Sequence, residues 1–304
     1  MKRFLLGCLC AAAAVGAPRA QSGTAQGFPP GADPASRERA GAVMRAFAAA
    51  YPGQITNVRY EDGDYAATVN GVTFYFAGGR LLPANLTPLS MDYSPHPFYT
   101  YTPGMPVWEE PTEEDAERIR AAVARRNGAP LKRSQEFYDT LLRAGTKDDA
   151  YARVKSMRFL GRSVLVHYSI IEELSLVEEA ILGAAKKSPA VRTWIDNLDS
   201  VTGWNWRSIA GTESRSFHSY GTAIDLLPRN RGNRDTYWLW TSAYNADWWA
   251  VPYSRRLNPP EEVIAAFESY GFIWGGKWLF YDTMHFEYRP EIFALNGIDY
   301  KRAW

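Results

Sequence analysis

The sequence predicts an α+β protein, in which helices and small antiparallel sheets are built from separate stretches of the chain. Residues 36–51, 112–157 and 170–199 have helical patterns. Residues 54–82 are broken by turn dipeptides, as in a β-meander. After Gly203 the chain changes to short strands and loops that are dense in aromatic residues. With 304 residues, 46% of them hydrophobic, the chain is long enough to bury a substantial core.

The first part of the predicted fold is a helix followed by a β-meander. The helix covers the Ala-rich residues 36–51, and the meander covers residues 54–82. Its turns are marked by dipeptides that favour tight turns: Asp62-Gly63, Asn70-Gly71 and Gly78-Gly79. The Pro- and Tyr-rich residues 92–111 are expected to be irregular, as a linker or as a strap packed on the surface. His96 lies there between two prolines and is expected to be a loop residue.

The middle of the chain is predicted to be mostly helical. Thr112–Asp115 is an acidic helix start, and Asn127-Gly128 is a stop signal. Residues 158–168 are predicted to form a strand, in which His167 faces a polar neighbour. The helical segment that follows the strand is interrupted near Ser188-Pro189.

The last third is predicted to contain short strands and one helix at about 260–270, without any internal repeat. We place a domain boundary near residue 105. The prediction is therefore a flexible leader at 21–35, an N-terminal helix and β-meander unit at 36–105, and a larger domain at 106–304.

Residues 1–20 have the pattern of a secretory signal peptide. Lys2 and Arg3 precede an apolar run that ends near Ala17, and cleavage is expected after Ala17 or Ala20. The run is too short to span a bilayer. We therefore expect an exported protein, periplasmic or extracellular, with no transmembrane segment.

Charge and cysteine content exclude several classes of protein. The formal net charge of +1 gives no indication of a nucleic-acid partner. Cys8 and Cys10 both lie in the signal segment, so the mature chain has no disulfide, thiolate ligand or cysteine nucleophile. Leu5-Leu6-Gly7-Cys8 resembles a lipoprotein cleavage box only loosely, because the hydrophobic stretch before it is too short.

Two of the four histidines lie in segments that suggest metal chemistry. Residues 216–225 read Ser-Phe-His-Ser-Tyr-Gly-Thr-Ala-Ile-Asp. From Gly221 onward this segment is expected to be a strand, with Gly221, Ala223 and Asp225 on one face and apolar residues on the other. Small side chains on that face leave room for a metal and a substrate. His218 lies at the strand entry, where it can turn toward Asp225.

The second segment runs from Asp282 to Glu287 and reads Asp-Thr-Met-His-Phe-Glu. His285 shares a strand face with Glu287. Together, His218, Asp225 and His285 offer two imidazoles and one carboxylate, which leave the fourth position of a tetrahedral zinc ion open for water, as in catalytic sites. A nearby carboxylate can take the proton of that water, and Asp282 is the candidate for this base.

The pattern S-x-H-x-x-G-x-A-x-D followed by a carboxylate-x-x-His resembles the VanY-type D-alanyl-D-alanine carboxypeptidases and the related L-alanyl-D-glutamate endopeptidases. These are zinc peptidases of the Hedgehog/DD-peptidase fold. The resemblance covers about residues 200–292, and a Gly-Phe-x-Trp-Gly-Gly stretch at 271–276 belongs to it. It implies a small antiparallel sheet with flanking helices and one Zn²⁺ per chain, held by His218, Asp225 and His285.

The resemblance also implies roles for other residues. Asp282 matches the catalytic base, and Arg207 matches the arginine beside the scissile carbonyl, with Arg215 as a rival for that role. Ser216 and Trp274, with Arg215, are implied to lie at the substrate. Ordinary alternatives stay open: a surface ion pair for Arg207 and a local turn hydrogen bond for Ser216.

The function implied by the resemblance is hydrolysis of peptidoglycan stem peptides, as a D-alanyl-D-alanine carboxypeptidase. An L-alanyl-D-glutamate or cross-link endopeptidase is the alternative within the same chemistry. A zinc-stabilised module that binds the cell wall or a protein without cleaving is an alternative of another class. The expected partner is peptidoglycan or a muropeptide, and the sequence leaves the oligomeric state open.

Overall fold

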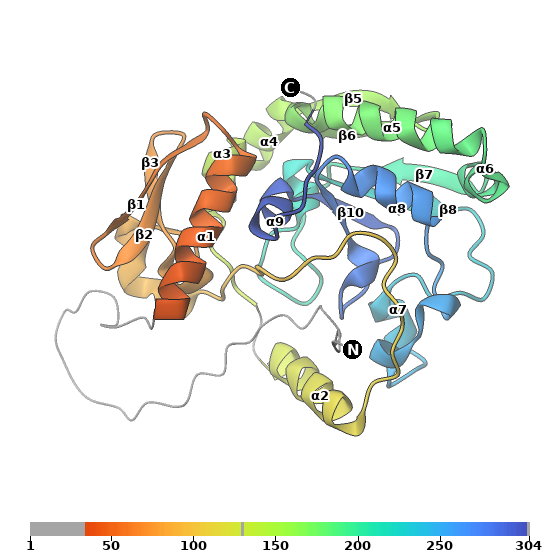
Figure 1. Ribbon diagram of the computed structural model, residues 1–304, viewed down its shortest axis with the longest axis horizontal. Helices are drawn as coiled ribbons and strands as arrows, with labels where there is room; N and C mark the ends of the chain where they lie inside the picture. The colour runs from red at the N-terminus through yellow and green to blue at the C-terminus, as the bar shows by residue number, and fades with distance from the viewer. Residues whose placement is uncertain (1–33, 129–130, 303–304) are drawn as a thin grey trace.

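The computed structural model describes residues 34–128 and 131–302. The predicted signal peptide and almost all of the predicted leader lie outside these residues. The described chain is an α+β protein with small antiparallel sheets, as predicted (Figure 1). None of its described helices combines the length and the apolar character that a membrane span needs.

Helices and strands follow one another in the order labelled in Figure 1. The described α-helices are α1 (Pro34–Ala50), α2 (Glu113–Gly128), α3 (Glu136–Leu142), α4 (Lys147–Arg153), α5 (Ile171–Ala185), α6 (Pro189–Asp196), α7 (Trp238–Ser242), α8 (Glu261–Glu268) and α9 (Pro290–Leu295). The described strands are β1 (Ile55–Glu61), β2 (Asp64–Val69), β3 (Val72–Tyr75), β4 (Leu82–Pro83), β5 (Val154–Phe159), β6 (Arg162–His167), β7 (Leu198–Thr202), β8 (Ala223–Pro228), β9 (Phe272–Trp274) and β10 (His285–Tyr288).

The N-terminal unit is the predicted helix and β-meander. Strands β1 to β4 pair in sequence order, and the Asn70-Gly71 turn joins β2 to β3. Phe47 of α1, Phe74 of β3 and Phe137 of α3 pack edge to face in the core beneath the sheet. This core continues to Phe293 of α9, against which α1 packs. The domain boundary near residue 105 stays a prediction.

The middle of the chain contains more strand than the sequence pattern indicated. The described part of residues 112–157 forms the helices α2, α3 and α4, and the chain is already extended from Val154 onward. The single strand expected at 158–168 is one arm of the β5–β6 hairpin. Its two-residue turn, Leu160-Gly161, has positive φ at both positions, but the usual Asn-Gly or Asp-Gly signature is missing from the sequence. The short strand β7 ends the segment that was predicted to be helical up to residue 199.

The sheet that carries the candidate site has the order β7-β8-β10-β9 and is antiparallel. Its apolar face packs against α5 and α8, where Ile224, Leu226 and Phe286 are buried. Phe286 stacks on Phe267 of α8 with 3.9 Å between ring centroids. The predicted alternation is confirmed from Ala223 onward, where β8 begins, and Asp225 is left on the opposite face. Gly221, which was expected in the strand, instead ends the turn before it.

The strap, residues 92–111, has almost no regular structure and runs from the N-terminal unit past the second sheet to α2 (Figure 1). Glu268 of α8 fixes it in place. The Glu268 carboxylate accepts hydrogen bonds from the Tyr101 hydroxyl at 2.6 Å and from the Gly104 backbone at 2.7 Å. Lys277 forms a buried ion pair with Glu268 and donates to the Thr102 carbonyl at 2.7 Å. The strap is thus tied to the region that carries the candidate site.

Candidate metal centre

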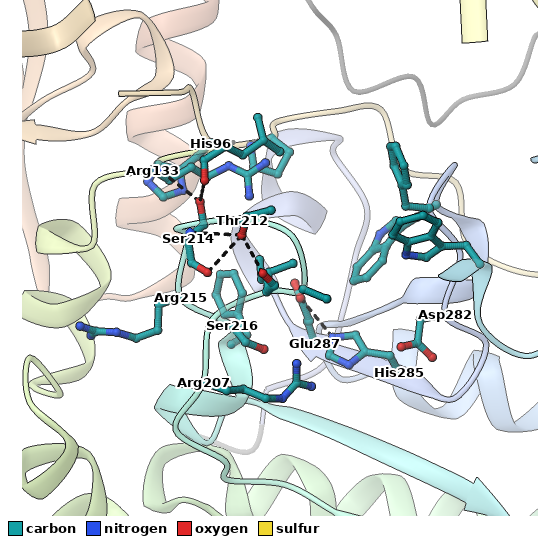
Figure 2. A pocket seen from close by; sticks show the side chains of 18 of the residues that line it. His96, Arg133, Arg207, Thr212, Ser214, Arg215, Ser216, Asp282, His285 and Glu287 are labelled. Carbon is teal, nitrogen blue, oxygen red and sulfur yellow. Dashed lines mark hydrogen bonds and ion pairs between the residues drawn. The ribbon is translucent and has the colours of Figure 1, made fainter. Parts of the chain in front are cut away.

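A cleft of about 690 Å³ contains the predicted catalytic region (Figure 2). Its walls come from distant parts of the sequence: the strap, α2, the loop 207–217 and the ends of β8 and β10. Asp225 and His285 lie in the wall of this cleft.

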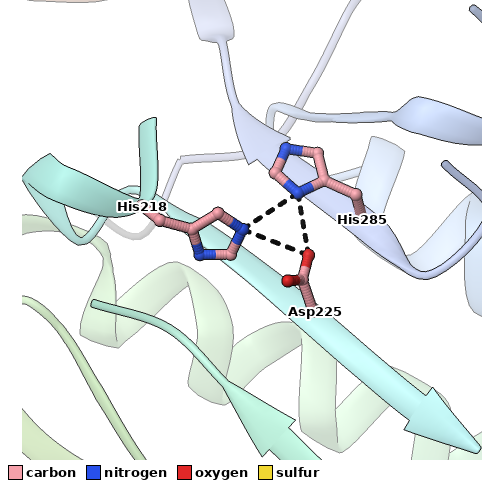
Figure 3. A group of neighbouring side chains, drawn as sticks. All are labelled: His218, Asp225 and His285. Carbon is pink, nitrogen blue, oxygen red and sulfur yellow. Dashed lines mark hydrogen bonds and ion pairs between the residues drawn. The ribbon is translucent and has the colours of Figure 1, made fainter. Parts of the chain in front are cut away.

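His218, Asp225 and His285 bring three possible ligand atoms together (Figure 3). His218 Nε2 lies 3.1 Å from Asp225 Oδ1 and 3.1 Å from His285 Nδ1, and His285 Nδ1 lies 2.8 Å from Asp225 Oδ1. Three donors bound at about 2.0 Å to one tetrahedral ion would be roughly 3.3 Å apart. The spacing and the nature of the donors therefore fit a single zinc ion.

Local folding explains why these three residues meet. In the antiparallel pair of β8 and β10, Asp225 and His285 are directly opposite each other. A short 3-10 turn, Phe217–Tyr220, places His218 just before β8. The turn ends at Gly221 with φ of +74°, and a Cβ there would lie 2.7 Å from the His167 backbone nitrogen. Only glycine fits this position.

Each imidazole is oriented by a contact on its other nitrogen. His218 Nδ1 lies 2.6 Å from the Gly203 carbonyl oxygen, so Nδ1 carries the proton and Nε2 presents its lone pair to the ligand cluster. His285 Nε2 lies 3.1 Å from Glu287 Oε1, which leaves Nδ1 for the metal. Glu287 in turn accepts a hydrogen bond from Arg289 at 3.5 Å. Such outer contacts fix the tautomer and orientation of histidine ligands.

The carboxylates of the site have opposite pKa shifts. Burial alone would raise the pKa of Asp225, but His218 and His285 hold it well below its ordinary value. Burial, and then the charge of Asp225, raise the pKa of Asp282 to about 7. Burial would lower the pKa of His285, but Asp225 and Glu287 raise it to about 10.

Asp282 and Arg207 both line the cleft beside the ligand cluster (Figure 2). Asp282 precedes β10, and its carboxylate accepts a hydrogen bond from the Met284 backbone at 3.2 Å. Arg207 is exposed at the cleft, and its charge lowers the pKa of Asp282, although burial and Asp225 outweigh it. Two groups therefore lie beside the candidate ligands. The Asp282 carboxyl group can exchange a proton, and the Arg207 guanidinium supplies a positive charge.

The three residues predicted at the substrate differ in position. Ser216 lines the cleft, but its hydroxyl accepts a hydrogen bond from the His218 backbone at 3.3 Å, the local turn contact considered as the alternative. Arg215 forms an ion pair with Asp139 and lies over the Trp206 ring at 4.3 Å. Arg215 lies in the cleft wall, but its guanidinium is already engaged by Asp139 and Trp206.

Trp274 requires a correction, because it does not line the cleft. Its side chain is fully buried in the core, and its indole nitrogen donates to the Thr283 carbonyl at 3.0 Å. Trp274 pairs with Phe286 across β9 and β10, and paired residues project to the same side of a sheet. Since Phe286 faces the apolar core, Trp274 does too.

Several residues of the cleft wall were not singled out from the sequence. His96 comes from the strap, Arg133 from the segment before α3, and Arg289 from the residue after β10. Arg289 extends the alternation of His285 and Glu287, so the period of two could have found it. No local pattern marks His96 or Arg133, because their approach depends on the tertiary fold.

Comparison with known families agrees with this geometry. Residues 210–288 match the model of a family described as D-alanyl-D-alanine carboxypeptidase. The match includes the three candidate ligands and Asp282 but begins after Arg207. Residues 43–98 match a family described only as a domain of unknown function. No curated protein and no solved structure matches the chain.

The cleft and its ligand cluster, together with this match, support a metallopeptidase as the class of protein. Within that class, the matched segment is similar to the D-alanyl-D-alanine carboxypeptidase family.

Proposed function

We propose that this chain is an exported, zinc-dependent peptidase that removes the terminal D-alanine from peptidoglycan stem peptides. The observation that carries the proposal is the convergence of His218, Asp225 and His285 within 3.1 Å of one another, with Asp282 in the same cleft. One Zn²⁺ per chain would be held by these three side chains, in a catalytic domain at 106–304.

The metal and the side chains would have separate roles in the reaction. Bound zinc would act as a Lewis acid, which polarises the scissile carbonyl and makes water more acidic. Asp282 takes the proton of the attacking water and passes it to the leaving amine. Arg207 donates hydrogen bonds to the oxygen on which negative charge develops. Export suits this substrate, because peptidoglycan lies outside the cytoplasmic membrane.

Mass spectrometry of muropeptides incubated with the zinc-loaded protein tests the proposal. We expect pentapeptide stems to lose one alanine, and a chelator to abolish the loss. Asp282→Asn should reduce the rate by roughly 10²–10⁴-fold, because it removes the proton acceptor. Asp199→Asn is a matched control, since Asp199 is exposed and its nearest cation is Arg229 at 4.0 Å.

Other results would change the assignment. An internal cut in the stem peptide would move the protein to the endopeptidases. Zinc bound at one ion per chain without cleavage of any stem peptide would contradict the peptidase and favour a binding module.

A further inference from the structure

Tyr237, which directly precedes α7, lies beside Asp282. The two residues form an isolated antiparallel bridge. The backbone hydrogen bonds next to this bridge, at 2.9 and 2.8 Å, join the residues that flank Tyr237 and Asp282, so the bridge itself is a non-hydrogen-bonded pair. In such a pair the Cα atoms are about 4.5 Å apart and the two side chains project to the same side. Tyr237 and Asp282 both line the cleft, so that side is the cleft.

Neighbouring rings hold Tyr237 in place. Its ring packs edge to face against Trp240, with 5.6 Å between ring centroids, and against Trp238, with 6.0 Å. The Trp238 side chain also hydrogen-bonds to the Tyr237 hydroxyl, which accepts because an indole N–H only donates. Within residues 34–128 and 131–302, no acceptor takes the proton of this hydroxyl. The O–H group of Tyr237 is therefore an unused donor on a fixed ring.

The charges that act on Tyr237 are those of the candidate reaction site. Burial, and then the charge of Asp282, raise the pKa of Tyr237, whereas Arg126 and Arg207 lower it. These three charged residues also line the cleft. Because the ordinary pKa of tyrosine is about 10 and that of Tyr237 is higher, the hydroxyl keeps its proton at neutral pH. Tyr237 is thus a neutral hydrogen-bond donor close to both the candidate base and the Arg207 guanidinium.

We propose that Tyr237 is a further catalytic residue, whose hydroxyl donates a hydrogen bond to the oxygen on which negative charge develops during peptide hydrolysis. The inference rests on the proposed peptidase function. Arg207 is exposed, so solvent and salt screen its charge. Tyr237 is half-buried and held by two indoles, and such a donor needs no reorientation when the charge appears. The proton of the attacking water still passes to Asp282, and Tyr237 keeps its own proton throughout.

The test uses Tyr237→Phe, which removes the hydroxyl and keeps the ring. For a pentapeptide that ends in D-Ala-D-Ala, kcat should fall roughly 10–100-fold, as for one hydrogen bond to a charged group, with KM within about twofold of wild type. A phosphinate analogue of the scissile dipeptide, whose oxygens mimic the developing charge, should bind more weakly by the same factor as the loss in kcat/KM. Tyr244→Phe is the matched control, because Tyr244 is 71% exposed and does not line the cleft.

An unchanged kcat in Tyr237→Phe would overturn the proposal, and so would a loss through KM alone or a parallel loss of zinc affinity in chelator competition. A shifted acid limb in the pH profile of kcat/KM, with unchanged phosphinate affinity, would instead make Tyr237 a positioning residue for Asp282 and would also reject the proposal.

The phosphinate separates this inference from the proposed function. If wild type does not cleave the pentapeptide, the proposed function fails. Weaker phosphinate binding in Tyr237→Phe than in wild type would still support the hydrogen bond, and equal binding would reject it.

Discussion

The two four-stranded sheets of this protein are both antiparallel, but they bury different kinds of side chain. The first sheet, β1 to β4, buries apolar residues such as Val69 and Phe74. The second sheet buries His285 and Glu287 on the face that carries Asp225. Burying polar and charged groups costs free energy unless they are paired. Their presence in the second sheet therefore marks the face of the candidate site, whereas the first sheet buries mainly apolar side chains.

The comparison also separates two ways of contributing to one cleft. The second sheet places its own side chains in the cleft. The N-terminal unit contributes through the strap, residues 92–111. Glu268 and Lys277, which lie beside the second sheet, hold the strap in place. Substitutions of the same type in the two sheets should consequently differ in their effects on zinc affinity, peptidase activity and stability.

The largest expected difference is between Asp225→Asn and Asp64→Asn. Asp225→Asn removes a charged ligand, so zinc affinity should fall more than about a hundredfold and peptidase activity should disappear with it. Asp64 is a partly buried carboxylate of β2 that accepts hydrogen bonds from Ala77 and Tyr65. Asp64→Asn should leave zinc binding unchanged. Competition with a chromogenic chelator measures both affinities, and wild-type affinity in Asp225→Asn would disprove the ligand set.

A smaller difference is expected between Glu287→Gln and Glu61→Gln. Glu287 orients His285 from the side opposite the metal, and loss of such a contact typically reduces metal affinity by about 10–100-fold. Glu61 of β1 pairs with Arg59 in the first sheet and does not line the cleft, so its replacement should have no effect on zinc. The same chelator competition applies. Equal affinities in the two variants would mean that the Glu287 contact does not support the ligand.

Phe74→Ala in the first sheet should have the opposite result, a loss of stability without a loss of zinc binding. Phe74 is 1% exposed and packs against Phe137, so its truncation should reduce the free energy of unfolding by about 3–5 kcal/mol. The folded variant should still bind one zinc ion and keep kcat within about twofold, because Phe74 lies in the first sheet and is not among the residues that line the cleft. Urea unfolding and steady-state kinetics below the transition give the two values. A parallel loss of kcat would show that the sheets are energetically coupled.

The sequence indicated which three side chains meet in the cluster, because part of the pattern around His218 and Asp225 is local. A strand period of two places Ala223 and Asp225 on one face of β8, and the turn that ends at Gly221 brings the His218 ring to the same point. The pairing of β8 with β10 then sets His285 opposite Asp225. The α+β class and the β-meander were predictable for the same reason, since turn dipeptides and periodicity are properties of neighbouring residues.

The failures concern features that depend on distant contacts. Trp274 was placed at the substrate from a motif, but its pairing with Phe286 turns it into the core. The β5–β6 hairpin was missed because Leu160 adopts positive φ without a turn signature. His96 was expected in a loop, and it lies in one. Its burial beside Tyr138, however, depends on the path of the strap, which no pattern within residues 92–111 specifies.

The smallest expected effect concerns pH and uses His167, which lies outside the cleft. Burial lowers the pKa of His167 to about 4, whereas an unfolded histidine titrates near 6.5. Between these values the unfolded chain binds more protons, so the stability contributed by neutral His167 is complete above pH 6.5 and is lost as pH falls toward 4. Over 1.5 pH units this amounts to about 2 kcal/mol. His167→Phe should therefore lose less stability than wild type between pH 7 and pH 5. Urea unfolding of both zinc-loaded proteins at the two pH values measures the difference, and identical losses would show that His167 is not held neutral.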